Sequence, residues 1–386
     1  MSEPRREQRF DALVIGGGVI GLACAWRAAL RGLSVCVLER DAAGAGASAV
    51  AAGMLAPVGE AIWGEDELLA LNLESHRRWP SFAGELAEHS GLDVGYLQQG
   101  ALHLALDRDE AEQLRRRHRL HDEVGLSSRW LRPSECRALE PGVAPAVTAG
   151  LHAESEASVD PVRLTAALAA ALERSGGRIE TGAEVVAARF DGGDPELRTA
   201  SGETFVGAAV VLATGSWAGS AQWLPEVARP PVRPVKGEIL TVRGSRTEPL
   251  CERMVVTERV YVVPREDGRA IVGATMEEAG FDTTVTAGGI HELLREAYRV
   301  LPEIAEMELA ETSAGLRPGS PDNSPLIGRG ALDRLLVAGG HHRNGVLLAP
   351  VTGESVAALL AGDQPPVDLE PFSPTRFAPA REVAVG

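Results

Sequence analysis

Three glycines near the start of the chain have the spacing of a dinucleotide-binding turn. Gly16, Gly18 and Gly21 form the pattern G-x-G-x-x-G between a short apolar run and an alanine-rich stretch. Such glycines permit a tight turn, the close approach of a pyrophosphate and close packing of a helix whose N-terminus faces the phosphates. Glu39 follows 21 positions after Gly18, where this motif places an acidic side chain for the ribose hydroxyls. The spacing predicts a dinucleotide cofactor but leaves FAD and NAD both open.

Other features narrow the redox chemistry. Flavoenzymes reduced by NADPH commonly carry a second nucleotide-binding unit, and disulfide reductases need a redox cysteine pair. The sequence has no second glycine motif, and its four cysteines are scattered without Cys-x-x-Cys spacing: Cys24, Cys36, Cys136 and Cys251. We expect these cysteines to be buried. His341 and His342 are adjacent but have no further ligand at metal spacing, so we expect no metal site and favour a flavoprotein that oxidises a small substrate directly.

Length and charge limit the classes of protein to which this chain can belong. A chain of 386 residues, 45% of them hydrophobic, is long enough for two domains of about 100 to 200 residues each. Its formal net charge of -16 disfavours nucleic acid as a partner, because the surface repels phosphates. The first ten residues are polar and no apolar run reaches the roughly 20 residues of a membrane span, so we expect a cytoplasmic protein without a membrane partner.

The glycine turn lies inside a predicted strand–helix–strand unit. Residues 12–15 form an apolar run typical of a strand buried on both faces, residues 19–30 favour a helix, and residues 34–38 favour a second strand. Two more apolar runs, 208–213 and 335–338, end at glycines. Together these runs predict a parallel sheet.

The other segments favour helices and a second sheet. Helices are predicted at 65–88, 109–123 and 163–173. The third is followed by strand-like residues 178–180 and 185–187. Residues 232–280 alternate between apolar and polar side chains, which indicates an antiparallel sheet in an inserted domain.

Short motifs extend over most of the chain. The longest is the glycine- and alanine-rich segment Gly44–Pro57, and others lie at 234–238, 261–265, 272–275, 314–319 and 340–350. In order and spacing they resemble the glycine oxidases of the D-amino-acid oxidase superfamily. The resemblance implies FAD, two domains and oxidation of the carbon–nitrogen bond of an amino acid. Because no cysteine follows Gly339, it also implies FAD that is bound non-covalently.

We therefore expect an α/β fold of two interleaved domains. The Rossmann-like FAD-binding domain, with a parallel sheet, is predicted from residues 1–80, 151–220 and 315–386. The substrate-binding domain, an α+β unit on a mainly antiparallel sheet, is predicted from residues 81–150 and 221–314.

The resemblance also assigns cofactor contacts position by position. It places Val19 and Ile20 at the phosphate turn, Glu39 and Arg40 at the adenosine ribose, and Val185 at adenine. The complete implied set is Gly16, Gly18, Val19, Ile20, Gly21, Glu39, Arg40, Ala47, Ser48, Ala52, Gly53, Met54, Val185, His341, His342, Arg343, Asn344, Gly345, Val346 and Leu347. The stretch from His341 to Leu347 resembles the loop and helix start that lie against the flavin ring.

Substrate contacts follow from the chemistry and the resemblance together. Hydride transfer from an α-amino acid requires that the carboxylate be clamped, and the planar fork of arginine suits this task. Arg317 matches the carboxylate-binding arginine, Tyr261 adds a hydroxyl, and Arg343 matches a second arginine near the substrate. Met54 and Met276 resemble apolar positions of the substrate pocket.

Two further matches bear on substrate preference. Glu60 and Trp63 fall in the segment that forms a mobile lid in glycine oxidases. Arg259 stands where some relatives have a histidine, which leaves the preferred amine open.

The resemblance implies an oxidase acting on glycine, and on sarcosine or small D-amino acids, with water and O2. Its products are a 2-oxo acid, ammonia or an amine, and H2O2, and in the family this reaction supplies the imine for thiazole synthesis in the thiamine pathway. The resemblance further implies a homo-oligomer, a tetramer. Two alternatives stay open: a dehydrogenase that passes electrons to another acceptor, and a flavoprotein that serves an assembly or RNA, which the acidic charge disfavours.

Overall fold

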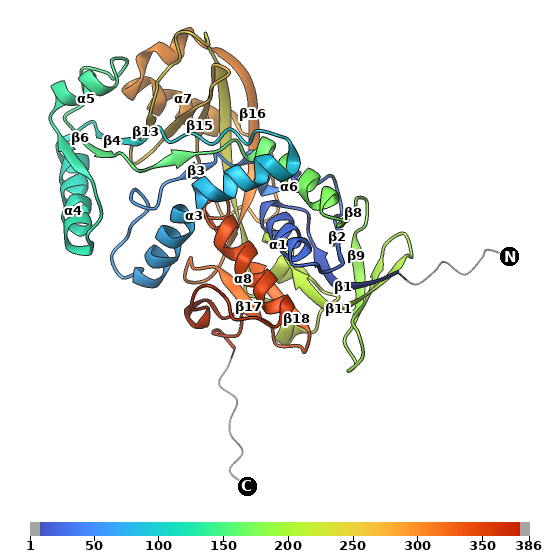
Figure 1. Cartoon of the computed structure of the whole chain (residues 1–386). Coiled ribbons are helices and arrows are strands. Elements are labelled where there is room, and N and C mark those ends of the chain that lie inside the picture. Colours follow the sequence, from blue (N-terminus) through green and yellow to red (C-terminus); the bar gives the residue numbers. More distant parts are fainter. Residues whose placement is uncertain (1–7, 379–386) are drawn as a thin grey trace.

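The computed structural model describes residues 8–378, which form two eight-stranded sheets and the helices around them (Figure 1). The first sheet runs β17-β18-β11-β1-β2-β8, and β10 and β9 extend from β11 as an antiparallel pair. Its strands are β1 (Gln8–Ile15), β2 (Val35–Leu38), β8 (Arg178–Glu180), β9 (Val185–Arg189), β10 (Glu196–Thr199), β11 (Thr204–Leu212), β17 (Leu326–Arg329) and β18 (Leu335–Gly339). The pairings among β18, β11, β1, β2 and β8 are all parallel, as predicted.

Helices α1 (Val19–Leu30), α3 (Asp66–Ser90), α6 (Pro161–Arg174) and α8 (Ala349–Ala361) pack against one another beside this sheet (Figure 1). Helix α1 is rich in small residues and is buried along nearly its whole length, so its neighbours approach it closely. Trp26, Trp79 and Phe82 fill the space between α1 and α3 with edge-to-face ring contacts. Residues 65–88 were predicted as helical and form one helix, which continues through Pro80.

The second sheet runs β16-β12-β15-β14-β13-β4-β6-β5 and is antiparallel except where β13 meets β4. Its strands are β4 (Ala101–Ala105), β5 (Arg129–Leu131), β6 (Ala149–Ala153), β12 (Arg233–Arg243), β13 (Met254–Val256), β14 (Tyr261–Pro264), β15 (Arg269–Gly273) and β16 (Glu308–Gly319). Around it lie α4 (Arg108–Val124), α5 (Pro133–Leu139), α7 (Ala287–Val300) and η3 (Pro302–Glu306). The mainly antiparallel second sheet is thus confirmed, and it also takes in strands outside residues 232–280.

Several short elements lie outside the two large sheets. They are β3 (Met54–Leu55) paired with β7 (Ala157–Ser158), α2 (Ala47–Val50), η1 (Gly215–Ser220), η2 (Glu226–Ala228) and η4 (Glu370–Phe372). Helix α2 and η1 both contact β16, the long edge strand of the second sheet. These contacts bring the glycine turn of the first sheet close to the second sheet.

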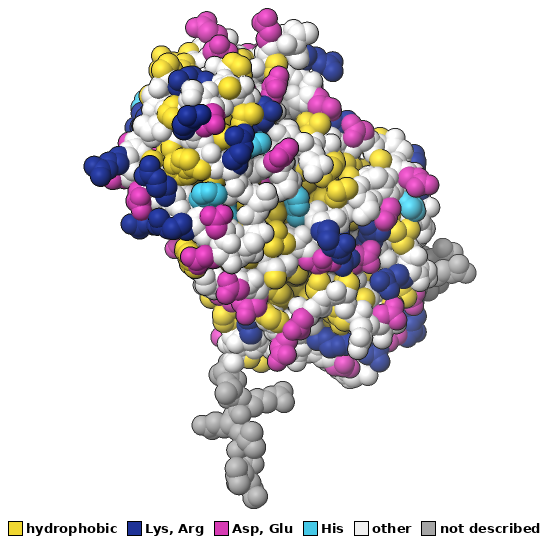
Figure 2. Space-filling model, turned by 60° about the vertical axis from the view of Figure 1, so that its left-hand side comes forward, with side chains coloured by type: hydrophobic (Ala, Val, Ile, Leu, Met, Phe, Trp, Pro, Cys, Tyr) yellow, Lys and Arg dark blue, Asp and Glu magenta, His cyan; other side chains and the backbone are white. Residues whose placement is uncertain are grey.

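Several simpler expectations can be compared with the structure. All four cysteines are buried, as predicted, and each is a free thiol in the structure. Within residues 8–378, no helix is both long and apolar enough to cross a bilayer, and no cluster of three potential metal-ligating side chains is present. On the face shown in Figure 2, acidic and basic side chains both occur among white and yellow ones.

Candidate active site

A cavity of about 560 Å³ is lined by residues of both sheets. The carboxyl ends of β1, β2, β11 and β18 contribute from the first sheet, and β12, β14 and β16 contribute from the second. Its volume lies in the range of small-molecule and cofactor sites, and ligands of open α/β sheets bind at this edge of the strands. We call the part around Gly16–Ile20, Glu39 and Arg40 the glycine-turn end, and the part around Arg317, Tyr261 and Arg343 the arginine end.

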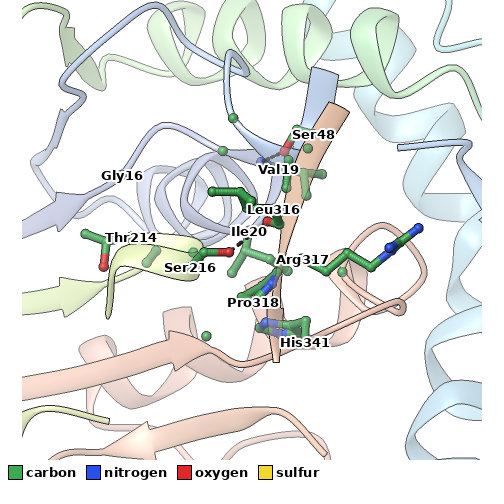
Figure 3. A pocket seen from close by; sticks show the side chains of 18 of the residues that line it. Gly16, Val19, Ile20, Ser48, Thr214, Ser216, Leu316, Arg317, Pro318 and His341 are labelled. Atoms are coloured by element: carbon green, nitrogen blue, oxygen red, sulfur yellow. Dashed lines mark hydrogen bonds between the residues drawn. The ribbon is translucent and has the colours of Figure 1, made fainter. Parts of the chain in front are cut away.

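Close packing of the backbone requires the glycines of the turn. Gly16 has φ of +105°, and a Cβ there would lie 2.4 Å from the carbonyl oxygen of Ala213. A Cβ on Gly21 would lie 2.0 Å from the oxygen of Gly16, so only glycine lets the helix pack onto the turn. Gly18 caps α1 without a side-chain hydrogen bond, and the N–H of Val19 donates to the Ser48 hydroxyl at 3.0 Å (Figure 3).

The Glu39 carboxylate lies directly beside this turn. Its Oε2 accepts from the N–H of Gly17 at 2.6 Å, and its Oε1 accepts from the N–H of Asp41 at 2.8 Å. Arg40 stacks over the Trp217 ring, 4.6 Å from the ring centroid. The acidic side chain is therefore fixed at the end of β2 by backbone contacts, where the sequence places a ribose-binding carboxylate.

The middle of the cavity is bounded by the 47–54 segment and by the turn between β18 and α8. Buried Arg265 donates from Nη2 to the carbonyl of Ala52 at 2.5 Å and thereby supports the first segment. His341 is buried, with Nε2 3.1 Å from the Thr352 hydroxyl, and burial lowers its pKa to about 3. Burial, and then the guanidinium of Arg317, lower the pKa of His342 to about 4. Both imidazoles are consequently uncharged at neutral pH.

At the arginine end, two glycines make room for two functional side chains. A Cβ on Gly237 would lie 2.2 Å from Nη1 of Arg317, and one on Gly273 would lie 2.4 Å from the Tyr261 hydroxyl. Arg317 extends from β16 away from the glycine turn (Figure 3). Burial raises the pKa of Tyr261, and the neighbouring Arg317 charge opposes that rise, so the phenol stays protonated at neutral pH.

A buried ion pair supports Arg317 from behind. Arg317 donates from Nη1 to the carbonyl of Thr275 at 3.2 Å. The Thr275 hydroxyl accepts from the N–H of Glu238 at 2.9 Å, and the buried Glu238 carboxylate pairs with Lys236 at 2.9 Å. The N–H of Lys236 donates to the backbone carbonyl of Glu277 at 2.9 Å. The carbonyl that orients Arg317 is thus tied to β12.

Arg343 lies on the opposite side of this end, in the turn before α8. Its Nη2 forms an ion pair with Oε1 of Glu60 at 2.7 Å, and both residues line the cavity. The Glu60 side chain is 24% exposed and that of Arg343 is 50% exposed, so the pair lies at the mouth of the cavity.

The structure brings nearly all the predicted site residues to this cavity. Every one lines it except Gly21 and Met276. Gly21 packs against the turn from behind, whereas Met276 is 66% exposed, beside the carbonyl of Thr275 that holds Arg317. Trp63 and Arg259 are also exposed and do not line the cavity.

Sequence reasoning missed the wall formed by Thr214, Ser216 and Trp217. Ser216 donates to the carbonyl of Leu316 at 2.7 Å and joins η1 to β16 (Figure 3). The signal was available, because this wall follows the predicted strand 208–213 at the carboxyl edge, where ligands of such sheets bind. Glu60 had been noted only as part of the segment that matches a lid.

The residues present fit FAD. The N-terminus of α1 faces the cavity, its N-cap residue Gly18 has no side chain, and its first turn has no acidic residue, so it can accept a pyrophosphate. Glu39 lines the same part of the cavity, and the cavity continues past the histidine turn to a pair of arginines. A charged, hydrogen-bonding region for nucleotide and an apolar wall for a ring system are both present.

Comparison with known proteins agrees with this geometry. Residues 11–359 match the family described as FAD dependent oxidoreductase. The chain is 36% identical to a glycine oxidase of Geobacillus kaustophilus (strain HTA426), over 95% of this chain and 97% of the relative. It is 35% identical to the bifunctional protein ThiO/ThiG of Synechocystis over 95% of this chain, but spans only 54% of that longer protein.

Solved structures give the same result. The crystal structure of glycine oxidase from Geobacillus kaustophilus matches with a TM-score of 0.90 at 36% identity, covering 96% of this chain and 100% of that chain. A glycine oxidase from Bacillus cereus matches with a TM-score of 0.85 at 32% identity, covering 92% of this chain and 95% of that chain. The chain therefore belongs to the glycine oxidase family of FAD-dependent oxidoreductases.

Proposed function

We propose that the protein is an amine oxidase that converts glycine, water and O2 to glyoxylate, ammonia and H2O2, and that it also accepts sarcosine or small D-amino acids. The observation that carries this proposal is the arginine end of the FAD cavity. There Arg317 and Tyr261 project from neighbouring parts of one sheet into spaces left by Gly237 and Gly273. The planar, positively charged guanidinium of Arg317 and the protonated phenol of Tyr261 can both donate hydrogen bonds to the carboxylate of an amino acid.

In this proposal Arg317 clamps the substrate carboxylate through two charge-assisted hydrogen bonds. Tyr261 stays protonated and donates a further hydrogen bond, because burial raises its pKa. Met54 lines the apolar side of the same space. Positioning of this kind supplies much of the rate, because it fixes the reacting carbon relative to its acceptor.

The proton chemistry requires no dedicated base on the protein. His341 and His342 are neutral, but neither is suited to act as a general base. Nε2 of His341 lies within hydrogen-bond distance of the Thr352 hydroxyl, and the pKa values of both imidazoles lie far below neutral pH. The substrate amine therefore reaches the site already deprotonated. When bound, FAD would supply the two-electron acceptor, and O2 would be the final oxidant.

The cofactor contacts are proposed on the same basis. The turn Gly16–Gly21 and the start of α1 would hold the pyrophosphate, Glu39 and Arg40 the ribose, and Val185 the adenine. The 47–54 and 341–347 segments would lie along the flavin. We also propose that the FAD-binding and substrate-binding domains divide as the sequence predicts, that the protein forms a homo-oligomer, and that its reaction serves thiazole synthesis.

The deciding experiment is an anaerobic titration of the purified holoprotein, followed by its visible spectrum. Glycine, sarcosine, D-alanine and D-proline are added in turn, and air is then readmitted with peroxide detection. Bleaching by glycine and rapid recovery with one H2O2 per flavin are expected. Recovery that is slow in air but fast with a quinone would instead indicate a dehydrogenase, and a flavin that no amine bleaches would refute the proposed substrate class.

A further inference from the structure

Among the residues that line the arginine end, Glu60 is the one acidic side chain and Arg317 and Arg343 carry the guanidinium groups. Arg117 does not line the cavity; it interacts electrostatically with Glu60 and Arg343, and also with the carboxylates of Glu156 and Glu258. Arg317 donates to the backbone carbonyl of Thr275 at 3.2 Å, and within residues 8–378 no carboxylate forms an ion pair with it. Arg343, by contrast, is paired with Glu60 at 2.7 Å. The site therefore offers a substrate one uncompensated positive charge, together with a neutralised pair at the mouth.

Both partners of this pair are held by their backbones. The N–H of Gly59, next to Glu60, donates to the fully buried Glu156 at 2.5 Å, and the N–H of Glu60 donates to Ala56 at 3.1 Å. On the other side, the N–H of Asn344 donates to His341 at 2.8 Å, which closes the turn around Arg343. Exposed ion pairs contribute little when long side chains must be ordered to form them. Here backbone hydrogen bonds fix the positions from which both side chains extend, so only the two side chains themselves remain to be ordered.

We infer, on the basis of the proposed function, that Glu60 determines the charge class of the substrate: by neutralising Arg343 it restricts the site to amines that carry a single carboxylate. A second carboxylate near the mouth would face the Glu60 carboxylate and would have to displace it from Arg343. Repulsion of the wrong ligand is a common source of specificity. Removing the Glu60 charge would convert Arg343 into a second anion-binding group.

The test compares two ligands of the same shape and different charge. Oxydiacetate carries two carboxylates, whereas its monoamide carries one, and neither has an amine to oxidise. Their dissociation constants are measured from the shift of the bound flavin's visible spectrum. The ratio of the two constants isolates the second charge, and it requires no turnover.

In Glu60→Gln we expect oxydiacetate to bind about tenfold more tightly relative to its monoamide than in the wild type, a size typical of one charge at a partly exposed mouth. Arg343→Gln should move the ratio the opposite way, by about tenfold, because Glu60 is then unopposed. Glu67→Gln removes an exposed carboxylate of α3 that does not line the cavity, and should leave the ratio unchanged. FAD content and thermal midpoint establish that each variant is folded.

An unchanged ratio in folded Glu60→Gln would overturn the inference, as would a shift of both variants in the same direction. If Glu60→Gln does not retain FAD, Arg343→Gln alone still decides, since an unchanged or increased preference for oxydiacetate contradicts the inference. In turnover, iminodiacetate and its monoamide should show the same tenfold change in kcat/KM. Failure of the wild type to oxidise glycine would refute the proposed function while leaving the binding ratios readable.

Discussion

The two ends of the cavity are built from different kinds of atoms. At the glycine-turn end, Gly16, Gly21 and the start of α1 present backbone, packed so closely that a single added carbon would meet a carbonyl oxygen. At the arginine end, Arg317, Tyr261 and Arg343 present long side chains from separate elements, and Gly237 and Gly273 leave the space that Arg317 and Tyr261 occupy. The first end is rigid because the chain itself forms it, whereas the second can be altered one side chain at a time.

This difference predicts that cofactor binding and substrate binding can be damaged separately. Changes at the glycine-turn end should reduce FAD content and affect all substrates equally. Changes at the arginine end should spare FAD and affect substrates according to their carboxylates.

The largest effect is expected from Arg317→Met. Losing two charge-assisted hydrogen bonds to the carboxylate should lower kcat/KM for glycine about 1000-fold. FAD content, read from the ratio of visible to ultraviolet absorbance, should stay at the wild-type level. A parallel loss of FAD would show that the two ends are not independent.

Next in size is Gly21→Ala. Its Cβ would lie 2.0 Å from the oxygen of Gly16, and backbone cannot yield as a side chain can, so we expect FAD to bind at least about 100-fold more weakly. Equilibrium titration of the apoprotein with FAD measures this. Gly84→Ala is the matched control, because a Cβ on this residue of α3 would meet no atom within 4 Å. Equal losses in both variants would contradict the packing argument.

The same substitution at the other end should act differently. In Gly237→Ala the added carbon meets the tip of Arg317, 2.2 Å away, and a flexible side chain can shift. We expect an increase of about tenfold in KM for glycine, with FAD affinity retained. Steady-state kinetics and the FAD titration together test this prediction. An unchanged KM would show that glycine binding does not depend on the present position of the Arg317 side chain.

The smallest effect at neutral pH concerns the histidine turn that joins the two ends, because it appears only as the pH falls. The pKa of His341 is about 3 in the folded protein and about 6.5 in the unfolded chain. Between these two pH values, the unfolded chain is protonated at His341 and the folded protein is not. Stability is therefore highest above pH 6.5 and falls as pH drops toward 4, with a slope of about 1.4 kcal/mol per pH unit for each such histidine.

His341→Gln should make this pH dependence shallower by the contribution of one histidine. Urea unfolding followed by circular dichroism at several pH values measures the slope. His291→Gln, at an exposed position on α7, is the control for removing an imidazole. A slope that His341→Gln leaves unaltered would exclude His341 as its source.

The parallel sheet could be predicted from the sequence because its signals are local. The apolar run before Gly16 and the runs before Thr214 and Gly340 each form a strand buried on both faces, and such strands need little long-range information. The second sheet was predicted only from residues 232–280. Its strands β4, β5 and β6 come from far earlier in the chain, and short half-buried strands give no local sign of their partners.

The site divides in the same way. The glycine spacing alone indicates the cofactor turn, but Arg317 was selected through resemblance, since an isolated arginine is by composition a surface residue. Pairing between Glu60 and Arg343 joins positions 283 residues apart, which no local pattern encodes. Met276 is predicted to line the pocket but is exposed. In this segment it is the backbone carbonyl of the preceding residue, Thr275, that contacts Arg317, and the apolar type of Met276 gives no sign of this.

The buried cysteines acquire a meaning from the product of the proposed reaction. Peroxide oxidises thiolates far faster than thiols, and low-pKa exposed cysteines are its usual targets. Burial raises the pKa of Cys36 to about 12 and that of Cys136 to about 11, and it raises the pKa of Cys24 and of Cys251 as well. The protein can thus release an oxidant at every turnover without exposing a reactive sulfur of its own cysteines to it.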